Sequence, residues 1–197
     1  MESELDTLNG LPILFFAQPQ DWESWLRDHH QDSRGTWVRM AKKDSGTPSI
    51  TYDQALDVAL CYGWIDGQKK TYDATSWLQK FTPRGAKSVW SKVNCEHVER
   101  LTAAGRMQPA GLRAVAAAKE DGRWEAAYDS PGTATVPPDF EAALEQNERA
   151  NAFWSSLNRT NRYAMLWRIQ TAKKAATRAQ RIEKFIHMLE NHEKLYP

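Results

Sequence analysis

The stretch from residue 60 to residue 94 holds the side chains best suited to ligand chemistry: LCYGWIDGQKKTYDATSWLQKFTPRGAKSVWSKVN. Tryptophan is costly to expose to water, so its rings should build a core or line a pocket. The cations, hydroxyls and amides between the rings suit an anionic or hydrogen-bonding ligand. The sequence therefore predicts a ligand-binding site made of Trp64, Asp66, Arg84, Lys87, Ser88, Trp90 and Asn94.

Local signals predict how these side chains could meet. Pro83 should end a strand and leave the Arg84 guanidinium free at a turn, and Ser88 is expected to cap a helix. Unsatisfied amides at a helix N-terminus attract anions, and tryptophan walls would lower the local dielectric. A second interpretation stays open, in which Arg84 pairs with a buried Asp66 as a structural lock. For Asp66, this lock is favoured over a role as general base.

The sequence contains no diagnostic catalytic or cofactor motif. His29 and His30 fall on adjacent faces of a predicted helix, and Cys95 with His97 offers no repeated spacing, so we predict no metal site. The glycines between residues 63 and 85 form neither a dinucleotide fingerprint nor a phosphate loop, so no cofactor is predicted.

Three functional hypotheses follow. The favoured one is a non-enzymatic protein that binds a small anionic ligand or an acidic segment of a protein partner. The alternative is an enzyme that uses Asp66 and Arg84 on a phosphorylated or carboxylate substrate. The third is nucleic-acid binding through the basic residues 173–184, which the formal net charge of +1 disfavours. The sequence leaves the oligomeric state open.

The composition is that of a globular protein. With 197 residues, 41% hydrophobic and 26% charged, the chain can bury a substantial core. The run LPILFF near the N-terminus is too short to span a membrane and lacks a preceding basic region. We therefore expect neither membrane insertion nor a signal peptide, and a cytoplasmic location. Cys61 and Cys95 fit no paired motif and are expected to be buried, reduced thiols.

Charge is distributed unevenly along the chain. Acidic residues dominate positions 120–148, and basic residues dominate positions 173–184. The favoured interpretation is a pair of solvated helix faces that attract each other.

Capping signals and periodicity predict two helices near the N-terminus. Asp21 should cap a helix over residues 21–31. Thr51 with Gln54 forms a capping box that opens a helix over residues 51–61, and Gly63 should end that helix. A small antiparallel sheet is predicted from residues 36–42, 64–72 and 76–82. Within it, Asp66-Gly67 marks either a turn or a β-bulge.

Beyond Pro83 the chain is expected to be almost wholly helical, with one helix starting at Pro109 and running through Lys119. Pro137 and Pro138 should exclude a helix from the linker-like segment SPGTATVPP. The last helix has a clear apolar stripe of Ile182, Phe185, Ile186 and Leu189. The predicted fold class is α+β, a small antiparallel sheet packed by helices and followed by an all-helical C-terminal region. The predicted domains are an N-terminal extension (1–18), an α+β domain (19–129), a linker (130–138) and a helical domain (139–192).

Several blocks of the sequence resemble a known family. In order along residues 20–190 they include ALCYGWIDGQKK, FTPR, SVWSKVN, GRM-x-PAGL, AKEDGRW, AYD, VPPDFEAAL, NRY and TRAQRIEKF. These blocks are similar to the YdeI/OmpD-associated proteins of bacteria, and the last ones resemble that family's bacteriocin-protection C-terminal domain. The resemblance implies a soluble bacterial protein linked to stress response or bacteriocin protection. It supplies no assigned catalytic residues that could be carried over.

Overall fold

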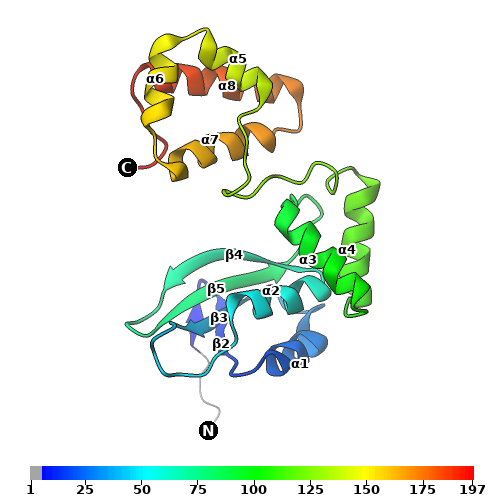
Figure 1. The fold of residues 1–197 in the computed structure, drawn as a ribbon. Coiled ribbons are helices and arrows are strands. Elements are labelled where there is room, and N and C mark those ends of the chain that lie inside the picture. Colours follow the sequence, from blue (N-terminus) through cyan, green and yellow to red (C-terminus); the bar gives the residue numbers. More distant parts are fainter. Residues whose placement is uncertain (1–5) are drawn as a thin grey trace. The chain divides into compact units, whose positions relative to one another are not determined.

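The computed structural model of the chain describes residues 6–197, which form two compact units (Figure 1). The first unit runs to Ser88 and continues with Asn94–Trp124, and the second contains Val89–Val93 and Glu125–Pro197. The sheet lies in the first unit, whereas the second is built from helices. The predicted α+β fold class with a helical C-terminal region is therefore confirmed.

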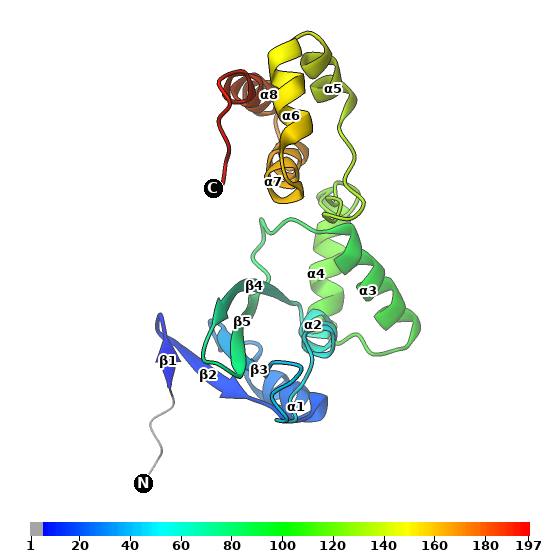
Figure 2. The ribbon, with the colours of Figure 1, turned by 60° about the vertical axis from the view of Figure 1, so that its left-hand side comes forward.

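The first unit contains a five-stranded sheet in the order β1-β2-β3-β5-β4. Its strands are β1 (Thr7–Leu8), β2 (Leu11–Phe15), β3 (Thr36–Ala41), β4 (Trp64–Thr71) and β5 (Ser76–Pro83). The three predicted strands are confirmed as β3, β4 and β5. The pairing of β4 with β5 shifts register between Asp66 and Lys69, so the sequence marks a bulge there and not a turn. Figure 2 shows the curvature of this strand pair.

Strands β1 and β2 lie in the stretch that the sequence analysis assigned to an N-terminal extension. Strand β2 pairs in parallel with β3, with Ile13 beside Trp37, and was not among the three predicted strands, whose own pairings are antiparallel as expected. Helix α1 (Pro19–His29) lies between the two strands in the sequence. A crossover of this kind is what a parallel pair requires, because a tight hairpin joins only antiparallel strands.

Helices α1 and α2 (Tyr52–Cys61) pack against the same face of the sheet. Trp22 of α1 is fully buried, its indole Nε1 donates a hydrogen bond to the Ala55 carbonyl at 3.1 Å, and its ring lies 5.6 Å from that of Phe81. The capping box at the start of α2 is confirmed. The expectation for Asp21 is wrong, because α1 begins two residues earlier at Pro19, a residue preorganised for the first helical position.

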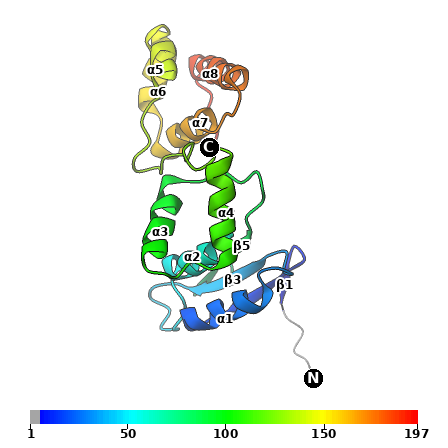
Figure 3. The ribbon, with the colours of Figure 1, turned by 90° about the vertical axis from the view of Figure 1, so that its right-hand side faces the viewer.

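Helices α3 (Lys92–Ala103) and α4 (Pro109–Glu120) follow β5, and Figure 3 shows α4 beside α2. Gly111 of α4 touches the end of α2, where an added Cβ would lie 2.2 Å from the Cys61 carbonyl oxygen. Gly63 ends α2 with a φ of +73°, as its position in the sequence predicted. Helix α3 begins at Lys92, so the prediction of a helix capped by Ser88 is wrong.

The second unit consists of four helices: α5 (Pro138–Glu145), α6 (Glu148–Ser156), α7 (Arg159–Gln170) and α8 (Ala175–Glu190). Asparagine side chains cap α6 and α7, because the Oδ1 atoms of Asn147 and Asn158 accept from backbone amides of the first turn. The expected exclusion of helix at Pro138 is wrong, since Pro138 is the first residue of α5. The core of this unit is built from Phe140, Leu144, Trp154, Met165, Ile169, Phe185 and Leu189.

Candidate functional site

Two of the predicted site residues lie on β4. Trp64 is a core residue that is 1% exposed, and its Nε1 donates to the His30 carbonyl at 3.1 Å. Its ring stands perpendicular to that of Trp25 at 5.8 Å. The half-buried Asp66 accepts a hydrogen bond of 2.9 Å from the Tyr52 hydroxyl, a contact that the sequence did not predict. Trp64 thus builds the core behind this strand, and Asp66 ties it to α2.

Arg84, Lys87 and Ser88 lie in the loop after β5. The Arg84 amide donates to the Gly63 carbonyl at 2.9 Å, and the Ser88 amide closes a turn onto the Gly85 carbonyl. No helix begins in this loop, so the helix N-terminal amides expected to attract an anion here are not formed. A ligand at these residues stays a prediction, supported now by loop cations alone.

The last two predicted residues are both buried and belong to different units. Trp90 is 2% exposed and lies in the second unit, while Asn94 is 7% exposed and lies on α3 in the first. Residues 89–91 are not helical because Tyr128 pairs with them. Its amide donates to the Trp90 carbonyl, and its carbonyl accepts from the Lys92 amide, each at 2.9 Å.

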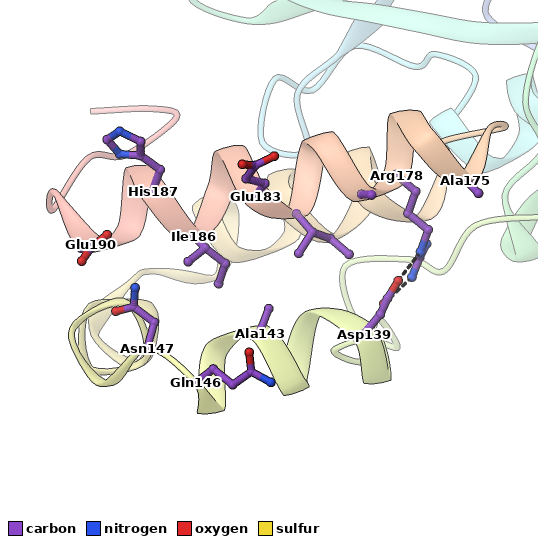
Figure 4. A pocket seen from close by; sticks show the side chains of 12 residues that line it. Asp139, Ala143, Gln146, Asn147, Ala175, Arg178, Glu183, Ile186, His187 and Glu190 are labelled. Atoms are coloured by element: carbon purple, nitrogen blue, oxygen red, sulfur yellow. Dashed lines mark hydrogen bonds and ion pairs between the residues drawn. The ribbon is translucent and has the colours of Figure 1, made fainter.

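A groove with a volume of about 770 Å³ opens between α5 and α8 of the second unit (Figure 4). Its floor is made of small and branched apolar side chains, namely Ala143, Ala175, Ala179, Ile182 and Ile186. Ile182 and Ile186 are only half-buried, whereas Phe185 and Leu189 on the same helix are buried in the core. The apolar stripe of α8 is therefore wider than the surface that packs into the core. Its half-buried part, Ile182 and Ile186, lines the groove.

An ion pair closes one end of the groove. Arg178 donates from Nε to Asp139 Oδ2 at 2.6 Å and from Nη2 to Oδ1 at 2.7 Å, the bidentate geometry of a strong pair (Figure 4). The hydrogen bonds from Arg178 hold the pKa of Asp139 below its usual range. The third contact of this guanidinium is a bond of 3.0 Å from Nη1 to the Ile169 carbonyl. Because Asp139 and the Ile169 carbonyl bind Nε and both terminal nitrogens of its guanidinium, Arg178 stabilises the fold here.

The rest of the rim is polar and includes two acids. Glu183 and Glu190 of α8 line it, and within residues 6–197 neither forms an ion pair. Gln146, Asn147 and His187 complete the rim (Figure 4). With the charges of Asp139 and Arg178 cancelled, the groove combines an apolar floor with a net negative edge.

Family comparisons cover both units. Residues 14–114, just over half of the chain, match the family described as "Domain of unknown function (DUF8412)". The chain belongs to the DUF8412 family. Residues 133–192 match a second family, described as "Bacteriocin-protection, YdeI or OmpD-Associated" (OmdA), which confirms the resemblance for the C-terminal region. No curated protein and no solved structure matches this DUF8412 chain.

The OmdA match contains the whole groove, because α5 to α8 all lie inside residues 133–192. Within residues 6–197, no group of three or more His, Cys, Asp or Glu side chains could hold a metal ion. Nor does this part of the chain contain a helix long and apolar enough to cross a membrane.

Sequence reasoning missed the groove although it identified the stripe on α8. Ile182 and Ile186 are spaced like core residues, and Phe185 and Leu189 have the same spacing. A periodic pattern gives the direction in which side chains point but not how far the neighbouring helix extends to cover them. The small residue Ala143 on the neighbouring helix α5 is the one available signal, because its short side chain leaves part of this row uncovered.

Proposed function

We propose that this chain is a non-enzymatic binding protein with a role related to bacteriocin protection, and that the OmdA groove holds a segment of a protein partner. The role is inferred from the OmdA match over residues 133–192. The mode of binding is inferred from the groove that this region contains. The observation that carries the proposal is the half-buried Ile182 and Ile186 beside two acids that form no ion pair within residues 6–197.

The occupant favoured by this lining is an amphipathic helix with basic flanks. A volume of about 770 Å³ suits a specific site, and an apolar groove between two helices accepts side chains spaced as i, i+3, i+4 and i+7. Glu183 and Glu190 would attract Lys or Arg on the edges of such a helix. A small anion is not favoured at this groove, because its only cation, Arg178, is paired with Asp139.

Binding explains the groove better than catalysis does. Its lining contains no Ser, Thr, Cys or Lys that could act as a nucleophile, and His187 contacts Asn191, the residue that follows α8. The enzyme hypothesis on Asp66 and Arg84 concerns the first unit and is independent of this groove.

The proposal is tested with a fluorescein-labelled model peptide that carries Leu at i, i+3, i+4 and i+7 and Lys elsewhere. A twin with Glu in place of Lys is the charge control. We expect the full chain to bind the Lys peptide more tightly, by about tenfold, because two exposed charge contacts contribute roughly 0.2–1 kcal/mol each. The double variant Glu183→Lys, Glu190→Lys should reverse this preference, whereas Glu141→Lys with Glu145→Lys, both exposed on α5 and outside the groove, should reverse it far less.

A matched pair of alanines on α5 locates the binding site. Ala143→Trp would fill the floor and abolish peptide binding, while Ala142→Trp, exposed and outside the lining, should leave it unchanged. The same variants are then expressed in a bacteriocin-sensitive strain, and survival is measured against a panel of bacteriocins. Survival with Ala143→Trp equal to that with the unmodified chain would remove the groove from any protective role. Absence of protection with the unmodified chain would contradict the role itself.

A further inference from the structure

The face of the sheet opposite α1 and α2 carries a row of rings and cations. Strand register places Arg39 beside Phe15 of β2 and beside Leu78 of β5, and Leu78 beside Lys70 of β4. Partners directly across neighbouring strands point to the same face. These four side chains therefore cross the sheet in one row.

The position of the helices identifies this face as the open one. Trp77 and Phe81 of β5 contact rings of the helical layer, since Tyr52 of α2 lies 6.5 Å from Trp77 and Trp22 of α1 lies 5.6 Å from Phe81. Side chains alternate between the two faces along a strand. Trp77 and Phe81 therefore point to the same face, and Leu78, which follows Trp77, points to the other face, away from α1 and α2.

Cations on this face lie over aromatic rings. The Arg39 guanidinium carbon is 5.0 Å from the centroid of Phe15 and 5.6 Å from that of Tyr72. Phe15 is 40% exposed and Tyr72 is 37% exposed, two of the few large apolar side chains at the surface. Within the described chain, no ion pair engages Arg39, Lys70 or Lys80.

The lysines are held above a buried ring. Lys70 Nζ lies 5.5 Å and Lys80 Nζ lies 6.0 Å from the centroid of Trp37, which is fully buried and whose Nε1 donates to the Leu8 carbonyl. Asp6 lies near this face, and its carboxylate accepts a hydrogen bond of 3.1 Å from the Tyr72 hydroxyl. Within residues 6–197 this carboxylate forms no ion pair with Arg39, Lys70 or Lys80.

We propose that this face binds single-stranded nucleic acid, an activity separate from the peptide groove of the second unit. Phe15 and Tyr72 flank one guanidinium, so two successive bases can stack on the rings while the phosphate between them meets Arg39. Lys70 and Lys80 extend the positive track toward the neighbouring phosphates. Single strands are favoured over duplex, because stacking on side chains requires unpaired bases.

The test is fluorescence anisotropy of the full chain with a fluorescein-labelled dT12 oligonucleotide at low and moderate salt. We expect saturable binding that weakens with salt, as release of counterions requires. Tyr72→Ala and Phe15→Ala should each weaken binding by about fivefold or more. Tyr196→Ala, which removes another exposed tyrosine that lies over an arginine, should have no effect.

Adjacent lysines on β4 give a matched control for charge. Lys70 lies over Trp37 on the open face, whereas Lys69 lies 4.2 Å from the Trp77 ring on the helix-covered face. Lys70→Gln should weaken dT12 binding and flatten its salt dependence, while Lys69→Gln should leave both unchanged. Both positions are exposed, so circular dichroism should report intact folds.

Three outcomes would overturn the proposal. The first is no binding of dT12 by the unmodified chain. The second is equal loss from Lys69→Gln and Lys70→Gln, which would indicate a general charge effect. The third is preferential binding of duplex DNA, of vesicles of phosphatidylcholine with phosphatidylglycerol, or of polyglutamate, which would assign the face to a different anionic partner.

Discussion

Replacing Gly111 by alanine should destabilise the first unit, although alanine is the better helix former. A Cβ at this position would lie 2.2 Å from the Cys61 carbonyl oxygen and 2.8 Å from that of Leu60. Both obstacles are backbone atoms at the end of α2, so no side chain can rotate away. The Cys61 carbonyl also accepts a hydrogen bond of 3.1 Å from the Gln108 amide, which fixes α4 at this distance. Accommodation requires α4 to move by roughly 1 Å to restore ordinary contact.

Two opposing contributions determine the magnitude. Helix propensity favours alanine over glycine by about 1 kcal/mol. Overpacking costs roughly 1–3 kcal/mol, and we expect the upper end because the obstacle is backbone. The net expectation is a loss of about 2 kcal/mol in the free energy of unfolding. For a chain of this size that corresponds to a Tm lower by roughly 4–8 °C.

The assay is differential scanning calorimetry, with hydrogen exchange of the α2 and α4 peptides to localise the effect. Ala116→Gly, at an exposed position of α4, calibrates the propensity contribution and should cost about 1 kcal/mol. Hydrogen exchange should accelerate in both helices of Gly111→Ala but only in α4 of the control. A Tm for Gly111→Ala equal to or above that of the unmodified chain would refute the close approach of α4 to α2.

Two further predictions concern ionisable groups of the first unit. Burial raises the pKa of Asp57, but hydrogen bonds from Arg100 Nη2 (2.6 Å) and His97 Nδ1 (2.7 Å) outweigh it and leave the pKa lowered. A lowered carboxyl pKa contributes stability that is complete above the ordinary value of 3.8 and is lost as pH falls through the folded value. The excess stability of the unmodified chain over Asp57→Asn, measured by urea unfolding, should therefore shrink below that pH, and a pH-independent excess would contradict this account. Burial also raises the pKa of Cys61 to about 11, and both Cys61 and Cys95 are buried and form no disulfide, as the sequence predicted. Iodoacetamide at pH 8 should label neither thiol in the native protein and both after denaturation without reductant. A disulfide between Cys61 and Cys95 in freshly alkylated protein would contradict this prediction.

The sequence was most informative where short-range chemistry decides the structure. The capping box of Thr51 and Gln54, the end of α2 at Gly63 and the start of α4 at Pro109 depend on neighbours within one helical turn. Strand β2 was missed for the opposite reason. Polar and apolar residues do not alternate in its run LPILF, because both faces of this strand are partly buried. Periodicity alone does not distinguish such a strand from other short apolar segments.

The predicted ligand site depended on one incorrect boundary. Ser88 has the residue type of a helix cap, yet α3 begins at Lys92. The extended backbone before it pairs with Tyr128, almost forty positions along the chain. A local signal cannot register a contact of that separation. Because α3 begins at Lys92, no helix N-terminal amides in the described part of the chain lie beside Arg84 and Lys87 to help them bind an anion.

Counting charges along the sequence did not show which cations have partners within the fold. The basic stretch 173–184 was the candidate for nucleic-acid binding, but in the structure Arg178 is bound to Asp139, and Arg181 donates to the Arg168 carbonyl. The expected attraction between the acidic and basic stretches is realised in that first pair. Arg39, Lys70 and Lys80 form no cluster in the sequence, and strand register brings them onto one face where no carboxylate forms an ion pair with them within residues 6–197. Whether a cation is available to a partner is therefore decided by tertiary pairing and not by local density. For that reason Lys70 beside Lys69 is the sharper test of nucleic-acid binding than any residue of α8.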